Sequence, residues 1–405
     1  MALNTALSGI NAAQSDLNVI ANNISNANTT GFKGSRAEFS DIFAVTGLNL
    51  SATATGSGTR LQDVAQQFAQ GDIETTNNSL DLAISGNGFF TVNDGNGVTY
   101  TRAGDFQKDP NGYVVTSSGA KLQVYPSNGA GGFDTSTLTD LKLVTAQSNA
   151  KATSQVTMTS NLPASATVPT TPFSTTDSTS YNDATPVTVY DSQGGSHQGT
   201  VYYVKTGTNT WDAHLYVDGN DAGTQGLTFD TTGKLTTPAN GNLAFNPVNL
   251  GNGSNALALT VNVTNTTQFG TDYSAGTINQ DGYEAGTLSN IDIDSKGVVT
   301  AYYSNNQNSQ IGQLAMANFA NLQGLRQVGN TSWAASGDSG SAVMGAAGTG
   351  QFGGIQSGAL EDSNTSDTTA QLVNMIKAQR NYQANAQVLS TDNTLASSLF
   401  NAVSR

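Results

Sequence analysis

Segments with a seven-residue apolar repeat occupy both ends of this 405-residue chain, and they constrain its fold more than any other feature. Each segment carries a broad stripe of apolar side chains at helical spacing, which predicts a long amphipathic helix. We expect the packing seams of these helices to be Leu3, Leu7, Ile10, Leu17 and Ile24 at the amino end, and Leu372, Met375, Tyr382, Leu389, Phe400 and Val403 at the carboxyl end. Small residues beside the first seam, such as Ala6 and Ala13, allow helices to approach closely.

The carboxyl-terminal helix is longer than a compact domain needs. Asp367 is the expected N-cap, because its carboxylate can accept hydrogen bonds at the positive end of the helix dipole. A helix from there to Val403 would be about 55 Å long. An antiparallel pair within one chain is an alternative, but a single pair would leave much of each stripe in water. We therefore interpret the two ends as polymerisation elements that pair in a coiled-coil-like manner and pack against other copies.

Between the ends, short apolar runs separated by glycine and proline predict β-strands. Alternation on both sides of the Gly194-Gly195 turn predicts a hairpin. Residues 211–217 show the same period of two, with one face inward. The polar tract at 145–182 contains several prolines and indicates the entry into a separate domain. The sequence thus predicts a mainly β, multi-domain and discontinuous fold with long amphipathic α-helices at its N- and C-termini.

Composition excludes several classes of function. The net charge of −14 disfavours a nucleic-acid partner or an anionic membrane surface. No apolar run reaches the length of about eighteen residues that a spanning helix needs, so we expect no membrane insertion. The absence of cysteine removes thiol catalysis, disulfides and cysteine zinc sites. The first basic residue is Lys33, so the amino end is not typical of a cleaved secretory signal peptide.

The motifs that could carry chemistry are better explained as turns. Residues 348–353 spell GTGQFG, but they lack the preceding strand and the following helix of a dinucleotide site. Residues 292–297 are similar to a calcium loop, yet Lys296 occupies a ligand position. His197 lies near a glycine turn and His214 on an outward strand face, without the partners of a metal site. We therefore expect no catalytic residue, no cofactor, no metal and a protein that is not an enzyme.

Several motifs resemble those of bacterial flagellar rod and hook proteins. The family motif lies at 21–33, where the sequence reads ANNISNANTTGFK, and its matching positions are Asn22, Asn23, Gly31, Phe32 and Lys33. Further matches are DLAISGNGFF at 81–90, YTRAGDFQKD at 100–109, QDGYEAG at 280–286, ANFANLQGL at 317–325 and LVNMIKAQRNYQ at 372–383. Residues 145–283 match by length and position alone. By this resemblance the chain is identified as a member of the axial-protein family, on its hook branch.

The resemblance implies a tube built from discontinuous domains. Residues 1–29 and 367–405 would form a terminal helical polymerisation domain, 30–70 and 356–366 an extended connecting region, 71–144 and 284–355 an inner β-domain, and 145–283 an outer β-domain. The chain would self-assemble into a flexible tubular universal joint that transmits torque from rod to filament. It would be located in the hook of the flagellum, outside the cell, after export without a cleaved signal peptide.

The resemblance also implies partners and leaves alternatives open. The partners would be other copies in a helical homopolymer, a hook-capping protein, the distal rod protein, the hook–filament junction protein and the flagellar type III export apparatus. A distal rod protein would share the terminal motifs but lack the insert at 145–283. A secreted β-rich adhesin or glycan-binding protein would need an aromatic, polar-rimmed groove in the outer domain.

Overall fold

The computed structural model describes residues 2–42, 56–129, 131–143 and 148–403, which divide into two compact units. The first unit comprises Met1–Val144, Asn290–Ala301 and Asn308–Arg405, so it holds both ends of the chain. The second unit comprises Thr145–Ser289 and Tyr302–Gln307. Strands dominate both units and the two long helices belong to the first, which confirms the predicted fold class. The four-region division made from the sequence stays a prediction.

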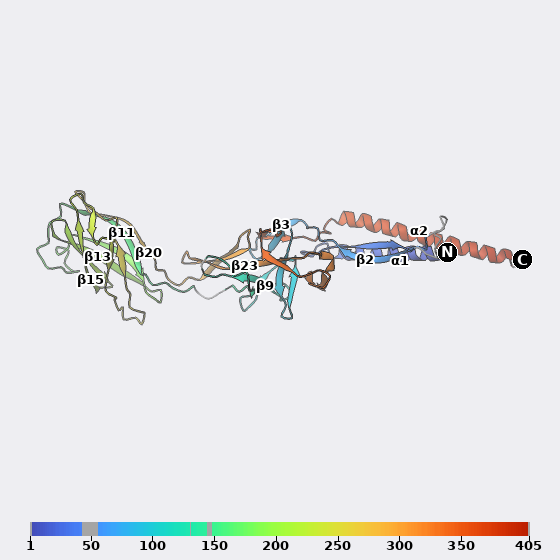
Figure 1. The fold of residues 1–405 in the computed structure, drawn as a ribbon, viewed down its shortest axis with the longest axis horizontal. Coiled ribbons are helices and arrows are strands. Elements are labelled where there is room, and N and C mark those ends of the chain that lie inside the picture. Colours follow the sequence, from blue (N-terminus) through green and yellow to red (C-terminus); the bar gives the residue numbers. More distant parts are fainter. Residues whose placement is uncertain (1, 43–55, 130, 144–147, 404–405) are drawn as a thin grey trace. The chain divides into compact units, whose positions relative to one another are not determined.

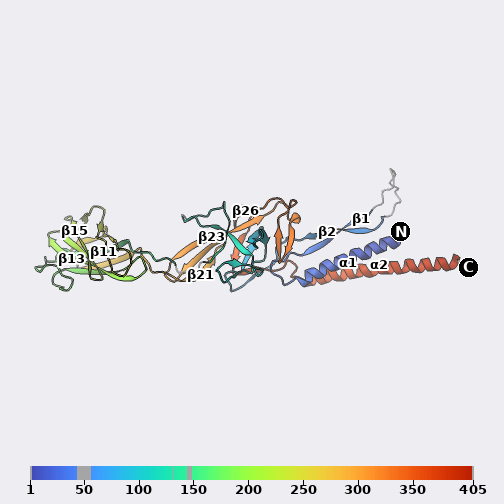
Figure 2. The same cartoon turned by 90° about the horizontal axis from the view of Figure 1, so that it is seen from below.

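Two long helices, α1 (Ala2–Ser25) and α2 (Thr368–Val403), lie side by side in the first unit (Figure 1, Figure 2). They are antiparallel, so the start of α1 and the end of α2 lie at the same end of the pair. The carboxylate of Asp367 accepts hydrogen bonds from the backbone N–H of Thr369 and of Ala370, each at 3.1 Å. These bonds satisfy amide groups that the first helical turn leaves free, and they confirm the predicted N-cap.

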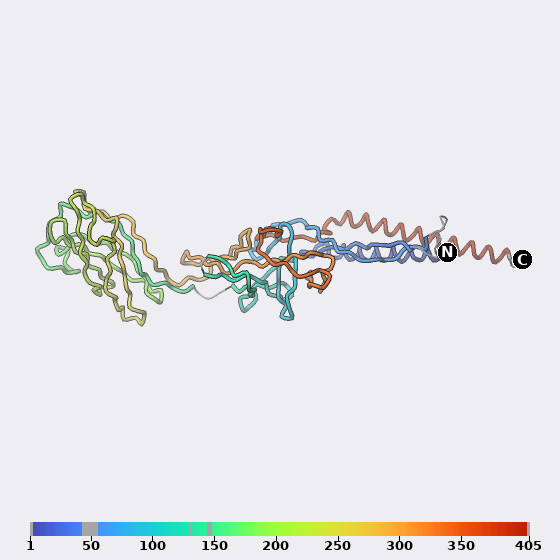
Figure 3. Tube along the Cα trace, viewed as in Figure 1, coloured from blue at the N-terminus to red at the C-terminus, as the bar shows by residue number. Residues whose placement is uncertain are grey.

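A hairpin follows α1 and packs along it. Its strands are β1 (Ser35–Asp41) and β2 (Thr59–Gln66), which are antiparallel with a bulge between Glu38 and Phe39. Figure 3 shows this hairpin beside α1. The backbone N–H of Thr59 donates to the hydroxyl of Ser8 on the helix at 3.2 Å. The weak alternation of this segment gave no strand prediction, because its apolar residues are scattered over both faces.

The rest of the first unit is built around one large sheet. Its main path runs β21-β22-β23-β9-β5-β6-β25-β24, and β10 and β8 pair with β9, β7 with β8 and β26 with β23. The strands are β5 (Phe89–Asn93), β6 (Val98–Thr101), β7 (Gln107–Lys108), β8 (Val114–Val115), β9 (Lys121–Pro126), β10 (Thr139–Asp140), β21 (Leu288–Ile293), β22 (Val298–Tyr303), β23 (Asn308–Asn318), β24 (Arg326–Gly329), β25 (Ser332–Ala334) and β26 (Val343–Ala346), with the short 3-10 helix η1 (Leu322–Gly324) before β24. β21 begins and β22 ends in residues of the second unit.

The chain returns to the helices through two short strand pairs. β27 (Gly354–Ser357) pairs with β4 (Leu82–Ser85), and β28 (Ala359–Glu361) pairs with β3 (Ile73–Thr75), both antiparallel. Beneath them lies an apolar core that includes Leu82, Phe90 and Leu122, all fully buried. The return strands therefore tie the segment before α2 to the β-core of the same unit.

The second unit contains two sheets. One is an antiparallel meander of β12 (Asp183–Tyr190), β13 (Ser196–Gly207), β14 (Thr210–Val217), β15 (Asn220–Phe229) and β16 (Leu235–Thr237). The other has the order β17-β18-β11-β19, with β20 paired to β11, and is built from β11 (Gln155–Pro163), β17 (Asn242–Ala244), β18 (Thr260–Asn262), β19 (Thr267–Phe269) and β20 (Ser274–Gln280). β11 pairs in parallel with β18 and β19 and antiparallel with β20.

Period-two alternation decides which side chains enter the core of the second unit. On β14, Trp211, Ala213, Leu215 and Val217 are buried, as the sequence predicted. The hairpin expected around Gly194 forms between β12 and β13. In the first unit, residues 294–298 and 348–353 close with backbone hydrogen bonds, so both segments form the predicted turns. The strand and turn predictions drawn from local pattern are confirmed here.

Candidate functional site

The predicted seam of α1 is only partly covered within the chain. Leu3 and Leu7 are 42% and 48% exposed, and Ile10, Leu17 and Ile24 are half-buried. The most buried apolar side chains of the helix lie on the adjacent stripe, where Ala6, Ala13 and Ile20 are between 3% and 6% exposed, and Ala27 just after the helix is 5% exposed. The chain therefore uses the small side of the apolar stripe for its own packing and leaves the large leucines near the amino end uncovered.

Small residues let the two helices approach closely. A Cβ added at Gly9 would lie 2.6 Å from Oδ1 of Asn385, so the glycine makes room for that side chain. Ala378 of α2 is 1% exposed and is also small. At the other end of the pair, the Thr365 hydroxyl donates to the backbone carbonyl of Asn23 at 3.0 Å. These contacts fix the antiparallel register of α1 against α2.

The predicted seam of α2 is more exposed than that of α1. Met375 and Leu389 are half-buried, whereas Leu372, Tyr382 and Phe400 are 50%, 37% and 77% exposed. The side chain of Val403 lies outside the described residues. An exposed phenylalanine on a helix is a surface that water solvates poorly. The arrangement can therefore bury more apolar area only by contact with something beyond this helix pair.

The family motif at 21–33 forms the joint between α1, the hairpin and the β-core. Asn23 is buried and bonds twice to Ser35, donating from Nδ2 to the carbonyl at 2.8 Å and accepting the backbone N–H on Oδ1 at 2.9 Å. Asn22 is exposed and has no comparable role in the joint. The side chain of Asn23, in the last turn of α1, thus ties the end of the helix to the start of the hairpin.

Glycine is required at position 31 of this joint. Gly31 has φ +65°, and a Cβ there would lie 2.4 Å from the backbone nitrogen of Ala103. Its N–H donates to the carbonyl of Glu361 at 2.7 Å. The following Phe32 is 7% exposed. Any larger side chain at 31 would separate the joint from the β-core by a steric clash as well as by backbone strain.

Lys33 belongs to a buried charge cluster that also contains Glu361 and Arg102. Lys33 Nζ lies 2.5 Å from Glu361 Oε1, and Arg102 Nη1 lies 3.2 Å from Oε2, with the Lys33 and Glu361 side chains fully buried. Oε1 also accepts the N–H of Gly71 at 2.9 Å, and Lys33 donates to the carbonyl of Ala69 at 2.8 Å. One carboxylate therefore holds together the motif loop, the segment after β2, the β-core and the return strand β28.

Burial acts on both cations of this cluster. It lowers the pKa of the Lys33 ammonium, against the opposing attraction of Glu361 and with a further decrease from the neighbouring Arg102. Burial also lowers the pKa of the Arg102 guanidinium, again opposed by Glu361. Buried charges are tolerated when they are paired and hydrogen-bonded, and removing one partner leaves the others uncompensated. The cluster is therefore a structural anchor rather than a reactive centre.

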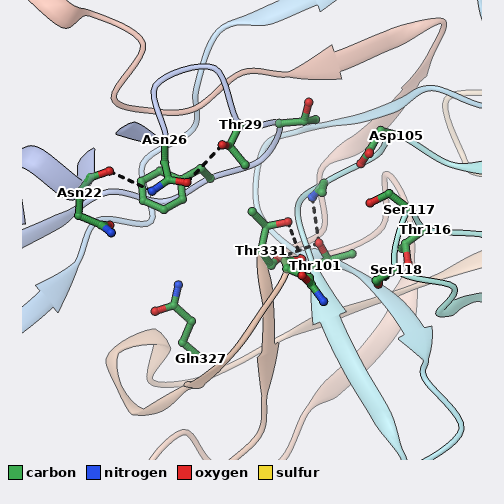
Figure 4. Close-up of a pocket in the computed structure, with 14 residues that line it drawn as sticks. Asn22, Asn26, Thr29, Thr101, Asp105, Thr116, Ser117, Ser118, Gln327 and Thr331 are labelled. Atoms are coloured by element: carbon green, nitrogen blue, oxygen red, sulfur yellow. Dashed lines mark hydrogen bonds between the residues drawn. The ribbon is translucent and has the colours of Figure 1, made fainter. Parts of the chain in front are cut away.

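A polar hollow of about 540 Å³ lies beside the joint (Figure 4). Its hydroxyls and amides largely bond to one another or to backbone: Thr101 Oγ1 donates to the Thr331 carbonyl at 2.8 Å, and Asn26 Nδ2 to the Asn22 carbonyl at 3.0 Å. Burial raises the pKa of the Asp105 carboxyl in its wall, with a smaller contribution from Asp81. Among the residues that the structure describes, no group of His, Cys, Asp and Glu could hold a metal ion.

Both histidines lie in the second unit and have structural partners. His197 Nδ1 is 2.6 Å from Asp218 Oδ2, and Nε2 is 3.2 Å from Asp191 Oδ2. His214 stacks on Phe173 with ring centroids 4.0 Å apart. Within the described residues, no helix is long and apolar enough to cross a membrane.

Sequence reasoning found some parts of this surface and missed others. It placed the helices and the N-cap and singled out Lys33. It gave no role to Arg102 or Glu361, because the partners of Lys33 are distant in the chain and a single glutamate between short strands carries no local signal. Whether the seam residues mediate polymerisation stays a prediction.

Four family models match successive parts of the chain. They are described as flagella basal body rod protein (residues 3–33), flagellar hook protein FlgE/F/G D1 domain (83–176), flagellar basal body protein FlaE D2 domain (161–283) and flagellar basal body rod FlgEFG protein C-terminal (356–402). The matches therefore extend over the helices and both β-regions.

Curated relatives match over their whole length. The flagellar hook protein FlgE of Salmonella typhimurium is 40% identical over 417 residues, covering 99% of this chain and 100% of the relative. The Escherichia coli K12 protein of the same name is 40% identical over 414 residues, with the same coverage. A solved structure of Helicobacter pylori flagellar hook protein FlgE2 aligns at 14% identity and a TM-score of 0.49, over 70% of this chain and 99% of that one.

Proposed function

The chain belongs to the flagellar hook protein family, and from this premise we propose that its paired terminal helices build the hook by self-assembly. It is a structural subunit of the flagellar hook, in a family of structural proteins rather than of enzymes. Its length and its match to the D2 model favour the hook subunit over a distal rod protein.

The observation that carries the proposal is the unfinished burial of the two helices. Between them they expose Leu3, Leu7, Leu372, Tyr382 and Phe400 at 37% to 77% while their small residues pack together. Each large side chain removed from water contributes roughly 1.5–3 kcal/mol if fully buried, and half-exposed side chains contribute about half of that. Several such contacts per copy are enough to drive association of a polymer.

The buried anchor supports a mechanical role. Lys33, Arg102 and Glu361 connect the end of α1 to the β-core through bonds of 2.5 Å and 3.2 Å in a buried site. A force on the helices would pass to the β-core through this cluster and through the Asn23–Ser35 pair. We propose that the hook is a flexible tubular universal joint in which the helices hold position while outer contacts slide, transmitting torque from rod to filament.

The finer assignments of partners and route rest on the same family membership. The proposed partners beyond further copies are the hook-capping protein, the distal rod protein and the hook–filament junction protein. Delivery is proposed through the flagellar type III export apparatus, without a cleaved signal peptide. We also propose that the chain has no catalytic activity of its own and no cofactor.

Electron microscopy of purified full-length protein over a range of concentrations tests the proposal. We expect tubes above a critical concentration and monomers below it. A control copy carrying Gln379→Asp, at an exposed polar position of α2, should still form tubes. The same experiment is repeated with preformed hook fragments as seeds for growth. If wild-type protein then stays monomeric at every concentration, self-assembly is contradicted.

A further inference from the structure

α2 carries a second set of exposed apolar side chains on the side away from α1. The side that faces α1 includes Met375, Ala378 and Leu389. The second set, here called the reverse face, consists of Val373, Ile376, Val388, Leu395 and Leu399, which are 47% to 66% exposed. With ~3.6 residues per turn, the two sets are centred about 140° apart around the helix. α2 is therefore apolar on two nearly opposite sides, whereas a helix packed against one partner needs a single stripe.

We propose that the reverse face of one copy packs against the α1 seam (Leu3, Leu7, Ile10, Leu17, Ile24) of a neighbouring copy. The proposal rests on the self-assembly proposed above. An open helical polymer joins two unlike surfaces of successive copies, because a surface that pairs with itself closes into a dimer. The first unit presents two such unlike apolar surfaces on adjacent helices. In a tube with one direction of growth, all copies have the same orientation. Because α1 and α2 are antiparallel within one chain, α2 of one copy is also antiparallel to α1 of its neighbour.

The lengths of the helices give the register of the contact. Within one chain Gly9 lies against Asn385, so α2 continues about eleven residues beyond the start of α1. In that overhang Leu395 and Leu399 are 58% and 66% exposed. A neighbouring α1 shifted by about eight residues, ~12 Å along α2, would cover the overhang and would place Leu7 opposite Leu395 and Leu3 opposite Leu399.

The same shift gives a favourable placement of charge. Lys377 and Arg380 both lie on the side of the reverse face, and the shift brings them to Ser25 and Asn22 at the carboxyl end of the neighbouring α1. That end carries the negative pole of the helix dipole and has no basic residue in its last turn. The α1 seam itself contains only uncharged residues, so no like charges meet across the contact.

Disulfide cross-linking between singly substituted copies tests the contact directly. The chain contains no cysteine, so introduced thiols report only on their own positions. Copies with Leu7→Cys and copies with Leu395→Cys are mixed in equal amounts, assembled into tubes and oxidised. We expect a linked heterodimer, since a disulfide needs Cβ atoms about 4 Å apart. Pairing Leu7→Cys with Ser397→Cys is the matched control, because position 397 points away from the reverse face, and it should give no link.

Two results in normally formed tubes would overturn the inference. One is the absence of the Leu7→Cys to Leu395→Cys link. The other is Leu395→Cys copies that link to one another, which would show that the reverse face pairs with itself.

A charge at the reverse face gives a second test. Leu395→Asp should raise the critical concentration for tube growth by about tenfold or more, whereas Ser397→Asp should change it less than about twofold. An unchanged urea denaturation curve of the first unit, which contains α2, would show that the variant folds. If wild-type protein forms tubes and Leu395→Asp forms them equally well, this contact is wrong while self-assembly stands. If wild-type protein forms no tubes, self-assembly itself is wrong, and the contact falls with it.

Discussion

The second unit and the paired terminal helices treat their apolar side chains in opposite ways. In the second unit, Trp211, Tyr203 and Leu215 are at most 1% exposed and the two sheets close on each other. On α2, Val388, Leu399 and Phe400 are 50%, 66% and 77% exposed. The second unit therefore buries its large apolar side chains within a single chain, whereas the helices leave theirs exposed to contact with further copies. The comparison separates residues that fold the subunit from residues that we propose assemble it.

The largest expected effect lies in the closed core. Trp211→Ala removes a 1% exposed indole whose Nε1 donates to Gln268 at 3.1 Å. We expect the second unit to lose about 3–5 kcal/mol of unfolding free energy. Phe400→Ala, on the exposed part of α2, should change the melting of the monomer by less than about 0.5 kcal/mol. Calorimetry of both variants measures this difference, and equal losses would remove the distinction between the two regions.

The next effect concerns the anchor that joins the helices to the β-core. Glu361→Ala leaves Lys33 and Arg102 buried without their carboxylate, so we expect the first unit to lose about 3–5 kcal/mol. The control is Glu38→Ala, whose partner Arg36 is 67% exposed, and which should cost less than about 1 kcal/mol. Urea denaturation followed by the fluorescence of Trp333 in the first unit measures both. A loss below about 1 kcal/mol for Glu361→Ala would mean that the cluster is not an anchor.

The third effect should appear in assembly and not in the folding of the second unit. Leu389→Asp puts a carboxylate at a half-buried seam position. In every copy of the polymer it removes roughly 1–1.5 kcal/mol of stabilisation from apolar burial, and desolvating the charge costs more. Tube formation should be lost, while the melting of the second unit should change by no more than about 0.5 kcal/mol. Gln379→Asp on the same helix is the control. Sedimentation distinguishes the variants, and normal pelleting of Leu389→Asp would exclude this seam from the assembly contact.

The smallest effect is a pH dependence confined to the second unit, which holds both histidines. Burial tends to lower the pKa of His197, but hydrogen bonds to Asp218 and Asp191 outweigh it and raise the pKa above its usual value. The charged imidazole therefore stabilises the fold at low pH, and this contribution is lost as the pH rises from about 6.5 through the raised pKa.

The expected loss is less than about 1 kcal/mol, because the site is partly solvated. Thermal melting at pH 6.5 and above should show it for the wild type and not for His197→Gln. Burial lowers the pKa of His214, so its titration falls on the acid side of that of His197. An equal pH dependence in the variant would assign the effect to other groups.

Local patterns in the sequence were sufficient for much of the fold. Alternation placed Trp211 and Leu215 in the core, and the carboxylate of Asp367 marked the start of α2. The joint was not predictable in the same way, because Glu361 and Lys33 are 328 residues apart in the chain and only the tertiary fold brings them together. The reverse face of α2 was missed for a different reason. A single heptad seam accounts for one side of a helix, and Val388 and Leu395 fall on the other side.

Hydrogen–deuterium exchange of monomer and tubes by mass spectrometry tests the central claim most directly, because it compares every segment in the two states. The account predicts that backbone amides of α1 and α2 exchange quickly in dilute monomer and gain the largest protection in tubes. Amides of the second-unit core, such as those of β14, should be protected equally in both states. Protection gained only in the second unit, with the helices exchanging at the same rate in monomer and tube, would contradict assembly through the terminal helices.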